Sequence, residues 1–174
     1  MKVKGTIVKR VQSAKYLGIT IDGHLSWKYH IEDLSGKLSK TIQAFKIVSK
    51  HLNDKHRKAL YFAYLFSRIQ YGIELYSQCN AKELKKIQVK QNTALKVLYR
   101  KDFYTHTNDL HKDIGLLQIK DIAKQSILKF IHKQQKGETP DAFIDYFPEV
   151  NTRHDIPTRQ QDDMVIPRCS NFAK

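Results

Sequence analysis

Residues 26–52 carry the pattern that most constrains the fold, a run of apolar side chains spaced for one face of a helix. These apolar residues recur at steps of three and four: Ile31, Leu34, Leu38, Ile42, Phe45, Val48 and Leu52. Such spacing predicts a long amphipathic α-helix, with Ser26 as its N-cap. Lysines of this segment, such as Lys28, Lys37 and Lys40, lie off the apolar face.

The next segment, residues 55–77, is apolar nearly all round. This composition is typical of a helix at the centre of a core, so we expect it to be the buried pillar of the fold. Asp54 is its predicted N-cap, and Gly72 is where a kink or pause is expected.

A third helix is predicted over residues 81–100, where Asn80 and Glu83 have the spacing of a capping box. Its predicted inner face consists of Leu84, Ile87, Ala94, Leu95 and Leu98. Its remaining faces make it the most basic helix, with Lys82, Lys85, Lys86, Lys90, Lys96 and Arg100. Further helices are predicted near 109–114, 119–136 and 140–147, the first two ended by Gly115 and Gly137.

The chain before these helices has the pattern of β-strands. Large apolar residues predict a half-buried strand over residues 15–21, bounded by Gly23. Residues 3–12 predict a weaker strand with a turn at Lys4-Gly5, so a small hairpin is the simplest pairing. Two or three strands are not stable alone in water, so this sheet looks unfinished. The predicted fold is mainly α, a short N-terminal β-hairpin followed by a multi-helix bundle.

The composition is strongly basic. Lys and Arg number 31 against 17 Asp and Glu, a net charge of +14. A polyanion such as nucleic acid would relieve the repulsion among these charges; a lysine-rich surface that only keeps the chain soluble is the alternative. No apolar run is long enough for a membrane helix, and the N-terminus lacks a secretory pattern. Cys79 and Cys169 form no disulfide framework, which favours an intracellular location, nucleus or cytoplasm.

Residues for catalysis or metal binding do not stand out. Asp162-Asp163 lies in a polar stretch rather than in a tight turn between apolar strands, and Glu32-Asp33 fits a favourable interaction with a helix N-terminus. Histidines recur at steps of five, as in His51 and His56, which does not align two imidazoles on one helix face. We therefore predict no catalytic residue, no metal site and no small-molecule substrate.

Basic and aromatic residues together do stand out. Lys and Arg on helix faces can neutralise phosphates without reading sequence. Tyr16, Trp27 and Tyr29, near the predicted strand-to-helix turn, have rings that can stack on bases or sugars. Trp27 equally fits a role in packing the helix start onto the strand, and the lysines of residues 81–100 equally fit an ordinary solvated face.

Several short stretches occur in an order typical of one protein family. They are Val8 to Asp22, with Lys15-Tyr16-Leu17-Gly18 inside it; Leu25-Ser26-Trp27-Lys28; His30-Ile31; Tyr71-Gly72-Ile73-Glu74; Leu84, Ile87-Gln88, Gln91-Asn92 and Ala94-Leu95-Lys96; His106-Thr107; Leu116, Ile119 and Ile122; Phe143, Tyr146-Phe147, Asn151-Thr152-Arg153 and Ile166-Pro167-Arg168. In order and spacing the chain resembles the C-terminal part of LINE-type, jockey-like non-LTR retrotransposon reverse transcriptases.

This resemblance implies roles for two regions. Residues 1–24 resemble the end of the palm with the primer grip, and residues 25–148 the thumb and connection that lie against the template–primer duplex. Residues 149–174 are expected to be a disordered tail because of their polar, irregular composition. In that family the fingers, most of the palm, the paired catalytic aspartates and their Mg site precede the primer grip. The resemblance thus implies a fragment of an RNA-directed DNA polymerase that is inactive alone and needs no cofactor of its own.

Two functions of different classes follow. The first is binding of RNA–DNA template–primer nucleic acid, for which the predicted contact residues are Lys15, Tyr16, Leu17, Gly18, Trp27, Lys28, Lys37, Lys40, Lys85, Lys86 and Lys90. The second is a non-catalytic helical protein-interaction module, with the missing palm and fingers segment as one partner. A relic of a transposon reading frame without function is also left open.

Overall fold

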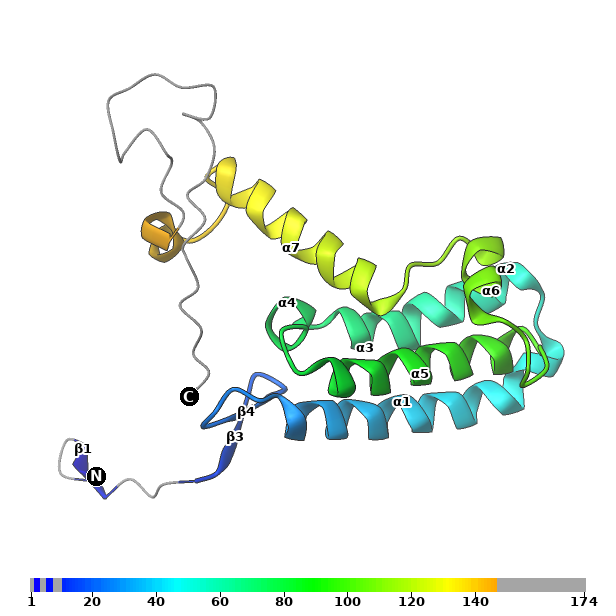
Figure 1. Ribbon diagram of the computed structural model, residues 1–174, viewed down its shortest axis with the longest axis horizontal. Coiled ribbons are helices and arrows are strands. Elements are labelled where there is room, and N and C mark those ends of the chain that lie inside the picture. Colours follow the sequence, from blue (N-terminus) through cyan, green and yellow to red (C-terminus); the bar gives the residue numbers. More distant parts are fainter. Residues whose placement is uncertain (1, 4–5, 8–10, 147–174) are drawn as a thin grey trace. The chain divides into compact units, whose positions relative to one another are not determined.

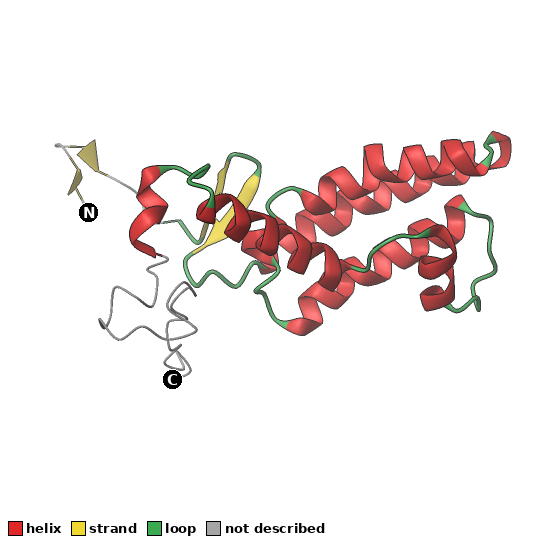
Figure 2. Ribbon diagram, turned by 90° about the horizontal axis from the view of Figure 1, so that it is seen from above, coloured by secondary structure: helices red, strands yellow, loops and turns green. Residues whose placement is uncertain are grey.

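The computed structural model describes residues 2–3, 6–7 and 11–146. The chain divides into two compact units, Met1–Ile127 and Leu128–Lys174. Helices make up most of the described chain, and its strands lie near the N-terminus (Figure 2). The predicted fold class, mainly α with a short N-terminal β-hairpin, is confirmed. The predicted tail, 149–174, lies outside the described residues, and the region boundaries stay predictions.

The described strands form two separate antiparallel pairs. β1 (Lys2–Val3) pairs with β2 (Thr6–Ile7), and the predicted turn between them, 4–5, lies outside the described residues. β3 (Ser13–Tyr16) pairs with β4 (Ile19–Asp22). The predictions of one strand over 15–21 and of its pairing with 3–12 are therefore wrong. The chain reverses inside the predicted strand, because its middle residues adopt a left-handed backbone that an apolar pattern does not reveal.

The long amphipathic helix is confirmed as α1 (Lys28–Val48), followed by the 3₁₀ turn η1 (Ser49–His51). Its buried apolar residues are Ile31, Leu34, Leu38, Ile42 and Phe45. The predicted N-cap at Ser26 is wrong by one residue, since Trp27 occupies the N-cap position. The side chain that receives the backbone amides before the helix is that of Asp22.

The predicted helix at 55–77 is a series of shorter pieces: α2 (Asp54–Leu60), the π-helix η2 (Tyr61–Phe66), α3 (Ser67–Gln70) and α4 (Ile73–Tyr76). The predicted interruption at Gly72 is confirmed, whereas the N-cap is Asn53 rather than Asp54. Four of its buried residues, Tyr61, Leu65, Ile69 and Ile73, follow steps of four, and Tyr76 is buried three residues after the last of them. A strict step of four drifts around an α-helix of 3.6 residues per turn, and the wider turn of η2 reduces that drift.

The expectation that this segment is buried all round is wrong. Phe62, Tyr64, Tyr71 and Leu75 are each at least 40% exposed. α1 packs against η2 and α3, and Gln91 of α5 (Ala81–Leu98) bonds to the Tyr61 hydroxyl, so the segment is covered on part of its surface only. Figure 1 shows α1 and α5 side by side, both beginning at the end nearest β3 and β4.

The third helix is confirmed as α5, capped by Asn80, whose side chain accepts a hydrogen bond from the amide of Lys82. A polar residue that its pattern did not place inside, Gln91, is fully buried. Gln91 donates hydrogen bonds of 2.8 Å to the Tyr61 hydroxyl and to the Leu117 carbonyl. Burial raises the pKa of Tyr61 to about 12, so its hydroxyl stays neutral within this network.

Two more helices follow α5, and the second of them crosses the boundary between the two units. α6 (Thr107–Ile114) ends at Gly115, whose φ of 67° supplies the left-handed C-cap. α7 (Ile119–Gln135) buries Ile119 and Ile122. Beyond residue 127, the 3₁₀ segment η3 (Asp141–Tyr146) follows Pro140, and the rings of Phe130 and Phe143 meet edge to face at 5.3 Å.

Candidate nucleic-acid interface

The hairpin turn, Leu17-Gly18, projects from the paired ends of β3 and β4. Tyr16 and Ile19 are the last paired residues, and both turn residues have positive φ, 46° for Leu17 and 82° for Gly18. This backbone matches the two-residue turns that follow the twist of antiparallel strands. Tyr16 and Leu17 are 67% and 72% exposed, so the tip of the hairpin is open to a ligand.

The same turn is anchored to the helix interruption at Tyr71-Gly72. The Tyr71 hydroxyl donates a hydrogen bond of 2.5 Å to the carbonyl of Leu17. Gly72 has a φ of 69°, and a Cβ on it would lie 2.6 Å from Cδ1 of Ile19. Glycine at position 72 therefore provides both the left-handed backbone and the space that β4 occupies. The hairpin tip is exposed but held.

Asp22 fixes the path from β4 into α1. Its buried carboxylate accepts hydrogen bonds from the amides of His24, Ser26 and Trp27 at 3.0–3.1 Å, and from the Ser26 hydroxyl at 3.1 Å. These bonds, the one from the Ser26 amide foremost, hold the pKa of Asp22 below its usual value. The charged carboxylate thereby satisfies amides that precede the helix.

His30 of α1 links β4 to α4. Its Nδ1 accepts a hydrogen bond of 3.4 Å from the amide of Thr20, and its ring lies 5.1 Å from that of Tyr76. The side chain is only 5% exposed, and this burial lowers its pKa, against the attraction of Asp33. A neutral ring suits its role as an acceptor.

The predicted contact residues around the hairpin differ in exposure. Lys15, Tyr16, Leu17 and Gly18 are all exposed at the hairpin. Trp27, by contrast, is 9% exposed and belongs to the core cluster. Its burial favours packing over stacking on a base, and we leave Trp27 out of the candidate surface.

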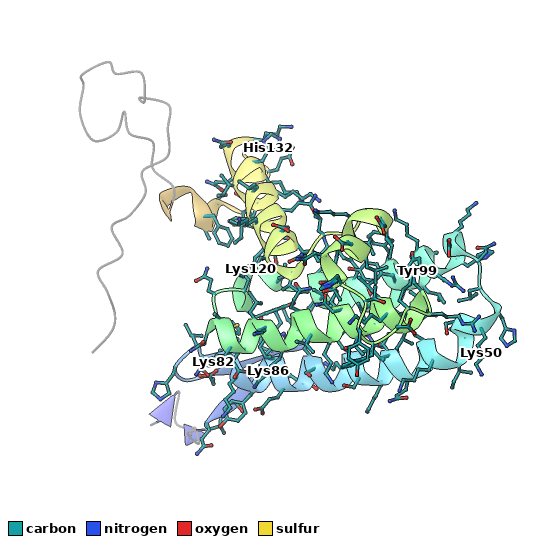
Figure 3. The ribbon with its side chains drawn as sticks, turned by 45° about the vertical axis from the view of Figure 1, so that its right-hand side comes forward. Lys50, Lys82, Lys86, Tyr99, Lys120 and His132 are labelled. Atoms are coloured by element: carbon teal, nitrogen blue, oxygen red, sulfur yellow. The ribbon has the colours of Figure 1, made fainter. Side chains whose placement is uncertain are left out.

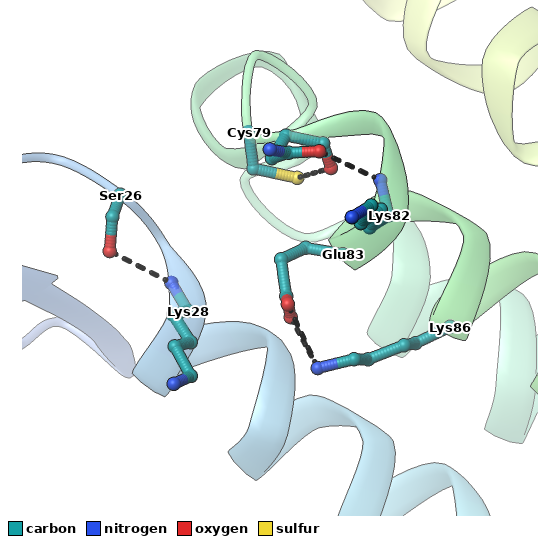
Figure 4. Close-up of polar contacts among 7 residues, drawn as sticks. Ser26, Lys28, Cys79, Lys82, Glu83 and Lys86 are labelled. Carbon is teal, nitrogen blue, oxygen red and sulfur yellow. Dashed lines mark hydrogen bonds and ion pairs between the residues drawn. The ribbon is translucent and has the colours of Figure 1, made fainter.

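Three lysines, which we call the helix-start lysines (Lys28, Lys82 and Lys86), lie at the first turns of α1 and α5. All three are exposed. Figure 3 shows Lys82 and Lys86 near the start of α5, and Lys50 at the far end of α1. Figure 4 shows the two helix starts together, with Lys86 bound to Glu83 at 2.7 Å. The positive ends of two helix dipoles add to the charge of these lysines.

The other predicted lysines lie elsewhere. Lys37 is paired with Asp33 at 2.7 Å. Lys40 borders a groove with Arg68. At a rise of 1.5 Å per residue, Lys40 lies roughly 18 Å along α1 from Lys28. Lys85 borders a different cleft that includes Lys120. Lys90 is partly exposed on α5. The predicted lysines therefore form several groups rather than one patch.

Sequence reasoning did not identify Tyr71, Lys82 or Asp22 as parts of the site. Tyr71 and Asp22 stand inside stretches that carried the family resemblance, which is the signal that could have singled them out. Within the described residues, no group of three or more His, Cys, Asp or Glu could hold a metal ion. No helix there is long and apolar enough to span a membrane.

Comparison with known proteins finds similarity to RNA-directed DNA polymerases of mobile elements. No family model matches the chain, and no solved structure does. Three Drosophila melanogaster proteins match: the probable RNA-directed DNA polymerase from transposon BS (24% identity, 67% of this chain), that from transposon X-element (24%, 66%) and the RNA-directed DNA polymerase from mobile element jockey (21%, 76%). The match spans only 13%, 13% and 15% of their respective lengths. About two thirds or more of this chain is thus similar to a short segment of RNA-directed DNA polymerases from mobile elements.

Proposed function

We propose that this chain is a fragment of the RNA-directed DNA polymerase of a non-LTR retrotransposon, the part that grips template–primer nucleic acid. The observation that carries the proposal is the anchored hairpin tip beside two basic helix starts. Sequence similarity to three polymerases of mobile elements supports the same reading.

The hairpin tip suits a primer grip because it is both exposed and held. The exposed side chain of Lys15 and the backbone of Leu17-Gly18 would contact the sugar–phosphate chain near the primer 3′ end. Tyr71 holds the turn through its bond to Leu17, and Gly72 leaves the space that Ile19 fills. A fixed contact positions a reacting end better than a mobile loop of the same composition.

The helix-start lysines would hold phosphates of the duplex further from the primer end. Their contribution is electrostatic, so it is independent of sequence and falls as salt rises. The net charge of +14 adds a general attraction to a polyanion. Lys85 and Lys40 would extend the contact to other faces of the helices.

Catalysis and Mg binding belong, in this proposal, to other parts of the intact polymerase. The described residues offer no cluster of metal ligands, so no catalytic step is assigned to them. The expected result of a primer-extension assay with the purified chain is no incorporation with or without Mg²⁺. Metal-dependent synthesis by the chain alone would contradict this assignment.

Binding is tested by fluorescence anisotropy with a labelled blunt RNA–DNA hybrid over a salt series. The proposal predicts an affinity that falls linearly on a logarithmic salt scale, with a slope near −0.9 for each phosphate contacted. No binding at low salt, or an affinity that does not change with salt, would contradict the proposal.

A second function, protein interaction, is favoured by apolar side chains left exposed around the hairpin. Tyr16, Leu17, Leu25, Tyr71 and Leu75 are all more than half exposed. We propose the remaining palm of such a polymerase as the partner in trans. This function predicts a poorly cooperative melt and dye binding by exposed apolar surface in the isolated chain. A sharp two-state melt without dye binding would count against it.

A further inference from the structure

The most exposed large hydrophobic side chains among the described residues are two neighbours, Phe103 and Tyr104 (82% and 91% exposed). They lie between α5 and α6, away from the hairpin in sequence. Large aromatic side chains side by side in water indicate a surface that another molecule covers.

This loop is ordered by contacts of its own. The amide of Thr105 donates a hydrogen bond of 3.1 Å to the carbonyl of Asp102, so the two aromatic residues occupy the centre of a tight turn. The two rings meet edge to face at 5.7 Å. Lys96 of α5 donates a hydrogen bond to the carbonyl of Phe103, and its ammonium lies 5.3 Å from the Phe103 ring centroid. The rings are therefore presented from a fixed backbone.

The surroundings of the rings are positively charged. Arg100 and Lys101 are exposed immediately before the turn, against the single acid Asp102. Lys96, Lys101 and Phe103 line a groove of about 410 Å³ together with Val89, Thr93 and Thr107. Aromatic rings with adjacent cations are the combination that binds unpaired nucleotides, whose bases stack while their phosphates are neutralised.

We infer that Phe103 and Tyr104 form a stacking site for single-stranded nucleic acid, distinct from the duplex contacts of the helix-start lysines. The inference rests on the proposed function, since both contacts would serve one nucleic-acid ligand. A paired duplex hides the faces of all its internal bases, so it gains little from these rings. An unpaired template strand offers both its bases and its phosphates.

The test measures anisotropy of a fluorescein-labelled oligouridine and of a blunt RNA–DNA hybrid with the full chain. Tyr104→Ala is expected to weaken oligouridine binding about tenfold and to leave hybrid binding within about twofold. Phe103→Trp preserves a stacking face and is expected to keep the parent affinity. Ile47→Ala, which removes an exposed large apolar side chain of α1, is the control and should change neither affinity.

The outcomes separate the inference from the proposed function. Equal oligouridine affinity for parent and Tyr104→Ala, or no oligouridine binding by the parent chain, would overturn the stacking site while hybrid binding still supports the proposed function. Loss of both affinities in a variant that melts like the parent would also overturn it. Oligouridine binding that depends on Tyr104, in a chain that binds no hybrid, would support the stacking site and contradict the duplex grip.

Discussion

The hydroxyl of Tyr71 donates a 2.5 Å hydrogen bond to the carbonyl of Leu17, joining the hairpin turn to a helix interruption 54 residues away in sequence. Both partners are exposed residues of short stretches that contain a left-handed glycine, Gly18 and Gly72. The bond and the close approach of Ile19 to Gly72 make these two stretches one structural unit.

Tyr71→Phe removes this hydrogen bond and keeps the ring. The variant is expected to lose about 0.5–1.5 kcal/mol of unfolding free energy, measured by denaturant unfolding. Hydrogen exchange of the amides in β3 and β4 should accelerate more than that of α5. Tyr64→Phe is the control, and an equal loss in both variants would mean that the bond to Leu17 has no specific effect.

Gly72→Ala should destabilise the chain by at least about 1 kcal/mol, because alanine disfavours the left-handed backbone and its Cβ would displace Ile19. Adding Ile19→Val removes the closest atom and should restore only the steric part. Gly36→Ala is the matched control: Gly36 lies inside α1 with nothing within 4 Å of an added Cβ. That control should stabilise by about 0.5–1 kcal/mol through helix propensity.

Asp22→Asn should destabilise the chain by about 1–3 kcal/mol at neutral pH, because a neutral amide replaces a carboxylate that accepts several hydrogen bonds. The folded pKa of Asp22 is lowered, so its stabilisation is present above the unfolded pKa of about 3.9 and is lost as pH falls through the folded pKa. The difference between parent and variant in urea unfolding should therefore shrink below about pH 4. Asp33 also has a lowered pKa, through a hydrogen bond from Lys37, and remains in both proteins. A difference that persists unchanged at low pH would contradict the role of the charged carboxylate.

His30 predicts a second pH dependence, near neutrality. Burial lowers its folded pKa, so the unfolded chain binds a proton first as pH falls below about 6.5, and stability decreases until pH passes the folded value. Lys15 and Lys37 also oppose its protonation, while Asp33 favours it.

His30→Gln should make the slope of unfolding free energy against pH shallower by up to about 1.4 kcal/mol per pH unit. The slope is measured by urea unfolding at several pH values between about pH 7 and 5. His111 remains in the variant and contributes with the same sign, because burial lowers its pKa too. His51→Gln, at an exposed histidine, is the control. An unchanged slope in His30→Gln would show that the His30 ring is not held neutral by folding.

The helices could be predicted from sequence because their cores follow simple spacing. The pattern from Ile31 to Phe45 and that of α5 both match the buried faces. The hairpin could not be predicted from sequence. Leu17 has a positive φ because of the turn and the bond from Tyr71, whereas leucine itself favours an extended backbone. The Ser26 hydroxyl accepts a hydrogen bond of 3.4 Å from the amide of Lys28, but Asp22, four residues earlier, receives the amides of His24, Ser26 and Trp27.

The candidate site was predicted less completely than the fold. Exposure of Lys15, Lys28 and Lys86 follows from their position off the apolar faces. Burial of Trp27 depends on the path set by Asp22, and the proximity of the starts of α1 and α5 depends on packing between helices far apart in sequence. Such relationships require the tertiary structure.

The salt dependence of RNA–DNA hybrid binding in two charge-matched variants is the measurement that best distinguishes a grip by the two helix starts from general charge attraction. Lys28→Gln/Lys82→Gln/Lys86→Gln neutralises the helix-start lysines, and Lys46→Gln/Lys50→Gln/Lys55→Gln removes the same charge at exposed positions toward the other end of α1 and into α2. We predict that the first variant loses about tenfold or more in affinity and about one unit of salt slope per lysine, while the second stays close to the parent. Equal losses in the two variants would contradict a grip by the helix starts and leave only a general attraction between a basic chain and a polyanion.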